Sequence, residues 1–202
     1  LGKYRAGWSS EDFQEHRRVS QEALIAHENA HEKRVQNIFF NLSATFLENT
    51  TLVSSTEKPF LSLAHHWQSK SMSRFIVPKT SSETGSVWST AIAAKLQYPD
   101  RKCILFSDSQ GVCGALNNLA LAARTRGELF VFVVEDDPWS GSDVSPRTHD
   151  YPRYDKIKAE EARTFIENLG GEFVLFNESE EIPQKLTKLL PERRLSVFWS
   201  RA

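Results

Sequence analysis

Two histidines one helical turn apart, His27 and His31, stand in the sequence His-Glu-Asn-Ala-His, with Glu28 between them. At this spacing two imidazoles on one helix face can bind zinc while the glutamate activates a water molecule. A catalytic metal also needs a shaped and partly dry surrounding. The next three residues are Glu-Lys-Arg, and the helix predicted here has little apolar cover. The pattern therefore favours a solvated helix face, with a zinc hydrolase as an alternative.

Cys113 is the second candidate for chemistry. It lies in the segment Gly-Val-Cys-Gly-Ala that starts at Gly111, between an apolar run and a helical pattern. A thiol near a helix N-terminus can have a lowered pKa and act as a nucleophile, and His149 could serve as its base. No carboxylate is clearly placed in the sequence to orient His149. We therefore expect Cys113 to be a packing residue, with Gly111 and Gly114 setting the backbone geometry of a turn.

Carboxylates form the third candidate site. Asp108, in Ser-Asp-Ser, follows one apolar run, and Asp136-Asp137 follow the next. With the helical segment before them, they are similar to the cofactor-binding domain of thiamine-diphosphate enzymes, where a Gly-Asp-Gly turn and a later Asn-Asn pair hold a metal and the diphosphate. This resemblance implies Asp108 and Asp136 as metal ligands. Serines replace both glycines and aspartates replace the asparagines, so additional negative charge would face a diphosphate. A degenerate thiamine-diphosphate-binding enzyme domain is thus an alternative.

These candidates depend on an alternation of predicted helices and strands. Residues 102–134 predict a strand, a Gly-rich loop with Cys113, a helix and a second strand. Helical patterns at 85–96 and 155–169 flank this unit, and the second ends in Gly-Gly as a C-cap. Short apolar strands follow at 173–176 and 195–199. Such an alternation is typical of a mostly parallel sheet with helices on both faces, a Rossmann-like three-layer α/β fold.

The amino-terminal part predicts one long helix, from Ser10 to about Glu48, which precedes the α/β fold. Its second half carries an apolar stripe at helical spacing, formed by Val35, Ile38, Phe39, Leu42 and Phe46. The Thr- and Ser-rich stretch 49–58 predicts a loop. We therefore divide the chain into a long helix with a linker, residues 1–58, and a globular α/β domain, residues 59–202.

Bulk composition excludes several classes of protein. The chain has 202 residues, 40% of them hydrophobic, and a net charge of -1, so no basic surplus indicates binding to nucleic acid. No apolar run approaches the roughly 18 residues of a membrane span. Two cysteines are too few for a disulfide framework, which favours a reducing, intracellular setting.

A further resemblance involves several segments. Residues 111–117, Gly-Val-Cys-Gly-Ala-Leu-Asn, resemble the Ser-Asp-Arg-Gly-x-Cys-Gly-x-x-Asn segment of the γ subunit of F-type ATP synthases. Residues 3–6, Lys-Tyr-Arg-Ala, look like the end of that family's amino-terminal helix motif. Residues 159–176 and 197–202 are similar to its Phe-x-x-x-Gly-x-x-Val piece and its Tyr-Asn-Arg-Phe strand. Ser109-Gln110 replace the family's Asp-Arg, and the carboxy-terminal shaft helix has no counterpart.

The γ-subunit resemblance implies an α/β domain that has no active site. Without a second long helix to form a coiled-coil shaft, we expect no coupling of rotation to catalysis. The leading hypothesis is a non-catalytic structural subunit of a large assembly in the mitochondrial matrix, either an ATP synthase variant or a mitochondrial ribosome. It assigns no catalytic, cofactor-binding or metal-binding residue and no cofactor. Its partners would be other protein subunits, bound through the N-terminal helix and the irregular 135–154 loop, with RNA contact in a ribosome.

Overall fold

The computed structural model describes residues 9–27, 37–38, 41–42, 49–54, 67, 74–76, 84–125, 128–134, 157–176, 184–185 and 195–200. The chain divides into two compact units, Leu1–Val35 and Gln36–Ala202. The first unit contains helix α1 (Ser10–His27), and the second contains a parallel sheet with its helices. The division thus falls at residue 35, whereas the sequence suggested a boundary after residue 58.

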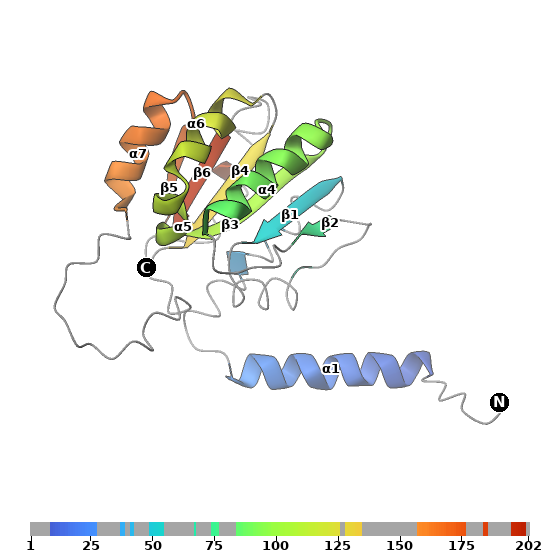
Figure 1. Ribbon diagram of the computed structural model, residues 1–202. Helices are drawn as coiled ribbons and strands as arrows, with labels where there is room; N and C mark the ends of the chain where they lie inside the picture. Colours follow the sequence, from blue (N-terminus) through green and yellow to red (C-terminus); the bar gives the residue numbers. More distant parts are fainter. Residues whose placement is uncertain are drawn as a thin grey trace, which may run out of the picture. The chain divides into compact units, whose positions relative to one another are not determined.

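The described strands form a six-stranded, fully parallel sheet in the order β2-β1-β3-β4-β6-β5 (Figure 1). The strands are β1 (Thr50–Ser54), β2 (Arg74–Ile76), β3 (Lys102–Asp108), β4 (Leu129–Val134), β5 (Glu172–Phe176) and β6 (Leu195–Ser200). The helices of this unit are α4 (Thr84–Gln97), α5 (Ser109–Gly114), α6 (Leu116–Arg124) and α7 (Ala159–Asn168). The predicted α/β fold with a parallel sheet is confirmed.

One side of the sheet packs under α4, α6 and α7, which lie on the same side in Figure 1. The strands contribute every second residue to this core, because successive side chains of a strand point to opposite faces. The strand residues of this core include Val53, Cys103, Leu105, Val131, Val133, Val197 and Trp199, and the helix residues include Trp88, Ala91, Leu119, Ala162 and Ile166. Near-continuous apolar strands are expected where both faces of a parallel sheet are covered.

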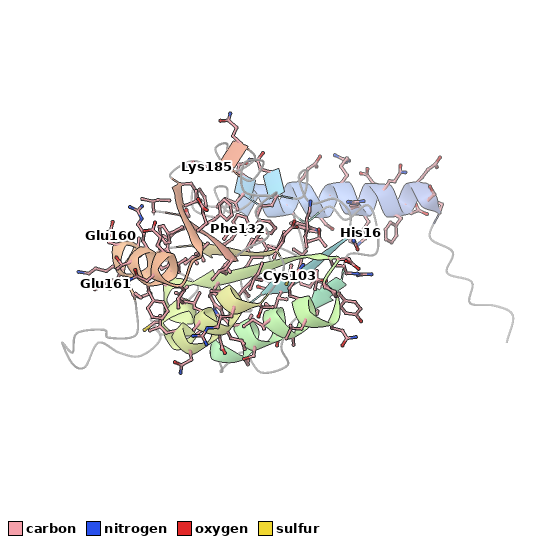
Figure 2. All side chains as sticks on the ribbon, turned by 90° about the horizontal axis from the view of Figure 1, so that it is seen from above. His16, Cys103, Phe132, Glu160, Glu161 and Lys185 are labelled. Carbon is pink, nitrogen blue, oxygen red and sulfur yellow. The ribbon has the colours of Figure 1, made fainter. Side chains whose placement is uncertain are left out.

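The other side of the sheet carries a row of three phenylalanines. Phe106, Phe132 and Phe198 are register partners in β3, β4 and β6, and their neighbouring ring centroids lie 5.6 and 4.8 Å apart. Phe132 lies inside the fold in Figure 2. Ile38 and Leu42, which are helical, are also buried and do not belong to the first core. The sheet is therefore apolar on both faces.

Helix α7 begins at Ala159, later than the predicted start at residue 155, and ends at Asn168, just before the predicted Gly-Gly C-cap. The side chain of Glu161, in the first turn, accepts a hydrogen bond from the backbone N–H of Lys158 at 3.0 Å. Glu160 and Glu161 point away from the fold (Figure 2). After the helix, Gly170 has a φ of 80°, a conformation that favours glycine, and the predicted C-cap is confirmed.

The structure corrects the prediction of a loop at 49–58, because Thr50–Ser54 is a completely buried strand. It pairs with β2 on one side and with β3 on the other, so it lies within the sheet. The Thr and Ser content suggested a loop, but β-branched Thr50, Thr51 and Val53 suit a strand once neighbours cover both faces.

The structure also corrects the predicted Gly-rich loop after β3. Residues Ser109–Gly114 form a short helix, α5. Among the described glycines, Gly170 is the one with a positive φ, so Gly111 and Gly114 have no left-handed conformation that would require glycine. The predicted turn is replaced by a helix, and a left-handed conformation is not the reason for either glycine.

The turn between α4 and β3 is held by side chains. The ammonium group of Lys95, a residue only 3% exposed, donates hydrogen bonds to the carbonyls of Pro99 at 2.7 Å and Arg101 at 2.6 Å. The Asn49 amide donates to the carbonyl of Asp100 between them at 3.1 Å. Because β3 begins directly after this turn, these contacts fix where the central strand starts.

Helix α1 is described by itself. Most of its described side chains are exposed, including Phe13 at 66% and Val19 at 50%. Arg18 forms ion pairs with Glu15 and Glu22, each 2.6 Å long. Neither α1 nor any other described helix has the length and hydropathy of a membrane span.

Candidate functional site

Asp108 ends β3 and is the register partner of Val134, which ends β4. Parallel strands end at the same edge of a sheet, so the two residues lie side by side at the carboxyl edge. In the sequence Val134 is followed at once by Glu135, Asp136 and Asp137. The structure therefore brings Asp108 next to Val134, the residue that directly precedes the acidic run. Asp136 and Asp137 themselves lie outside the described residues.

The topology of the sheet reverses beside this edge. β2, the strand that follows β1 in the chain, pairs with one side of β1. β3 follows β2 but pairs with the other side of β1, and the chain then continues to β4. Open α/β sheets bind ligands outside the carboxyl ends of the strands at such a switch point. The residues that end the two flanking strands are Ser54 and Asp108. We take this edge as the candidate functional site.

Ser54 is the site residue that the sequence did not indicate. Its side chain is 1% exposed, and within the described part of the chain its hydroxyl has no hydrogen-bond partner. Ser54 is in register with Phe106, two residues before Asp108. The signal that could have found it is the run Thr50-Thr51-Leu52-Val53, in which three of the four residues are β-branched and which indicates a strand ending at a serine.

Serines also flank Asp108 in the sequence. Ser107 is 6% exposed and Ser109 is 5% exposed, so both are nearly closed to solvent. Each of the two hydroxyls is a donor as well as an acceptor. The end of β3 thus combines a carboxylate residue with two buried hydroxyl residues.

The chemistry of these groups fits a divalent cation that bridges to an anion. Carboxylate oxygens are the ligands that Mg²⁺ prefers, and Mg²⁺ commonly binds one or two protein carboxylates together with phosphate oxygens. The acidic run 135–137 repels a bare anion, so a bound diphosphate needs the cation between them. Within the ranges that the structure describes, no three His, Cys, Asp or Glu residues are gathered as metal ligands. The cation would therefore depend on Asp108, the acidic run and the anion itself.

Cys113 lies in α5 and is half-buried, whereas its predicted base His149 is outside the described residues. The pairing of these two residues therefore stays a prediction. Cys103 is a buried thiol in β3, and its Sγ is 3.5 Å from the Ala91 carbonyl, to which it donates. Burial raises the pKa of Cys103 to about 12, against a smaller opposing effect of the Lys95 charge. Cys103 is thus protonated and inert as a nucleophile at neutral pH.

His27 is the last residue of α1, and Glu28 and His31 lie outside the described residues. The structure therefore does not place the three groups of the zinc motif together. The described part of α1 before them is largely solvent-exposed, as expected for a solvated helix face. The zinc hypothesis stays a prediction.

No protein-family model matches the sequence, and neither does any curated protein. Among solved structures, the chain is similar to a thiamine diphosphate-dependent 4-hydroxybenzoylformate decarboxylase from Rhodococcus jostii RHA1, with a TM-score of 0.68 and 14% sequence identity. The match covers 83% of this chain and 32% of the decarboxylase, so this chain spans about a third of that protein's length. At this identity the likeness shows that the two proteins share a fold.

Proposed function

We propose that this chain is a cofactor-binding domain that holds thiamine diphosphate, through a divalent cation, at the carboxyl edge of β3 and β4. The observation that carries the proposal is the register pairing of Asp108 with Val134, which sets a carboxylate residue beside the start of a second acidic segment. The likeness in fold to a thiamine diphosphate-dependent decarboxylase supports it by analogy.

Each residue has a defined task in this proposal. Asp108 supplies an oxygen ligand to the cation, and Asp136 supplies a second one. The cation offsets the repulsion between the acidic run and the diphosphate, so binding of the diphosphate requires it. When bound, thiamine diphosphate supplies the carbon nucleophile of its reactions. Because the chain spans about a third of the decarboxylase, we assign it cofactor binding and no complete reaction.

Calorimetry with thiamine diphosphate tests the proposal. We expect saturable binding by the whole chain in the presence of Mg²⁺ and its loss when EDTA removes the cation. Asp108→Ala should weaken binding by roughly 100-fold, because the cation loses one of its charged protein ligands. Asp100→Ala is the matched control, since Asp100 is exposed in the turn at the opposite edge of the sheet and should leave binding unchanged. No binding by the unmodified chain would refute the proposal.

The γ-subunit resemblance leads to a different proposal, a non-catalytic structural subunit of a large mitochondrial assembly. Its structural support is the exposure of two apolar side chains on the N-terminal helix α1, the predicted partner surface, with Phe13 at 66% and Val19 at 50%. Exposed apolar side chains are suited to contacts between subunits. Identification of the chains that co-purify with the protein tests it. ATP synthase or mitochondrial ribosomal subunits, lost in a Phe13→Glu, Val19→Glu variant, would support this proposal, and a protein that purifies alone would contradict it.

A further inference from the structure

Four buried polar atoms have no hydrogen-bond partner among the residues that the structure describes. They are the hydroxyl oxygens of Thr51 and Ser54 and the indole nitrogens of Trp88 and Trp199. Folded proteins satisfy the great majority of their buried polar atoms, so each exception needs an explanation. A buried hydroxyl without a partner destabilises the fold, and a ligand group that lies beside it can supply the missing partner.

Position in the sheet separates Ser54 from the other three. Ser54 ends β1 at the switch point, beside the strand that ends with Asp108. Thr51 is three residues earlier, about 10 Å along the strand, and is in register with Cys103 near the start of β3. Trp88 belongs to α4, and Trp199 belongs to β6, which does not border the switch point. Trp199 is one residue from the end of β6 and so is also near the carboxyl edge, but it belongs to the core under the helices, as Trp88 does. Ser54 is therefore the one of the four that ends a strand bordering the switch point.

We infer that Ser54 is a ligand-contacting residue of this edge and that its hydroxyl donates a hydrogen bond to an anionic oxygen of a diphosphate group. This inference rests on the function proposed above, because that function brings a diphosphate to the carboxyl edge. A serine hydroxyl is a suitable donor to such an oxygen, and a hydrogen bond to a charged acceptor is stronger than one between neutral groups. The contact adds to the affinity without adding charge to an acidic site.

The same chemistry fits a cofactor and free inorganic diphosphate. Three probes distinguish these sources, each with Mg²⁺: thiamine diphosphate, inorganic diphosphate and thiamine. If Ser54 contacts the diphosphate group, Ser54→Ala weakens both diphosphate probes and leaves any affinity for thiamine unchanged. A loss confined to thiamine would overturn the assignment of this contact to the diphosphate.

The decisive comparison is between Ser54→Ala and Thr51→Val, which remove the two unpartnered hydroxyls of the same strand. Calorimetry with thiamine diphosphate and Mg²⁺ should show an affinity about 10- to 100-fold lower for Ser54→Ala, the range expected for one hydrogen bond to a charged group. Thr51→Val should bind as the unmodified chain does. Equal affinities of all three proteins would overturn the inference.

Two further outcomes keep the inference distinct from the proposed function. If neither the unmodified chain nor Thr51→Val binds a diphosphate probe, the proposed function fails and this inference fails with it. If both bind and Ser54→Ala also binds normally, the inference fails alone. Ser54→Cys, a variant of similar size with a weaker donor, should give an intermediate affinity. Unfolding midpoints of both Ser54 variants at or above that of the unmodified chain confirm that weakened binding is not a loss of fold.

Discussion

Asp108 and Val134 are register partners at the carboxyl ends of two neighbouring parallel strands. This pairing links Asp108 with the acidic run that starts at Glu135, 27 residues later in the sequence. In the function proposed above, these carboxylates attract the cation and repel the diphosphate. The charge of the acidic run should therefore decide how tightly the edge holds a diphosphate.

Asp137→Asn should strengthen the binding of thiamine diphosphate at saturating Mg²⁺. The change removes one negative charge near the diphosphate and keeps an oxygen of similar position. One unit charge at a short distance in a water-like surrounding is worth about 1 kcal/mol, or roughly a fivefold gain in affinity. Calorimetry at fixed Mg²⁺ measures it, with Asp100→Asn as the control for a loss of charge elsewhere. Weaker binding by Asp137→Asn would show that this carboxylate is itself a ligand.

Lys95→Met should destabilise the protein. Methionine fills the space of the lysine stem, but the carbonyls of Pro99 and Arg101 lose their charged donor. Methionine carries no charge that folding must bury, and this offsets part of the loss. We therefore expect the free energy of unfolding to fall by about 2 kcal/mol. Urea denaturation measures the change. The adjacent and exposed Leu96→Ala is the control and should stay within about 0.5 kcal/mol of the unmodified chain.

Stability should fall at alkaline pH through Cys103. Burial raises the pKa of this thiol from 9.0 to about 12, so the folded protein keeps a proton that the unfolded chain releases above pH 9. The contribution is fully present below pH 9 and is lost as the pH rises toward 12, by at most about 1.4 kcal/mol per pH unit. We therefore expect the free energy of unfolding of the unmodified chain to fall relative to that of Cys103→Ala by roughly 2 kcal/mol between pH 8 and about pH 10.5. Parallel curves for the two proteins would contradict this.

The strands of the sheet centre could be predicted because they are continuous apolar runs. Lys102–Asp108, Leu129–Val134 and Leu195–Ser200 each contain a stretch that has few alternatives to a buried strand. Thr50–Ser54 could not be recognised in this way, since its hydroxyl-bearing residues also suit a loop and only pairing with both neighbours makes it a strand. Local composition does not contain this tertiary information.

The candidate site could be predicted only in part for the same reason. Asp108 was visible because it follows a clear apolar strand, and the fold-level rule for ligand sites applies to that position. Ser54 depends on β1, so missing the strand also hid the residue. The turn predicted at Gly111 and Gly114 failed because two glycines within six residues indicate a turn locally, although packing against β3 and α4 favours a short helix.

Thr51→Val should stabilise the protein, although it removes a polar group from a buried strand. Among the described residues the Thr51 hydroxyl has no partner, and its side chain is 1% exposed. Valine has nearly the same shape and high strand propensity, so the change removes the cost of a buried, unsatisfied hydroxyl, about 1 kcal/mol. Thr51→Ser is the matched control: it keeps the hydroxyl, loses a buried methyl group and should cost roughly 1 kcal/mol. Both changes are read from urea denaturation at neutral pH. If Thr51→Val were instead less stable than the unmodified chain, the hydroxyl would have to hold a partner, and the reasoning that sets Ser54 apart from Thr51 would lose its basis.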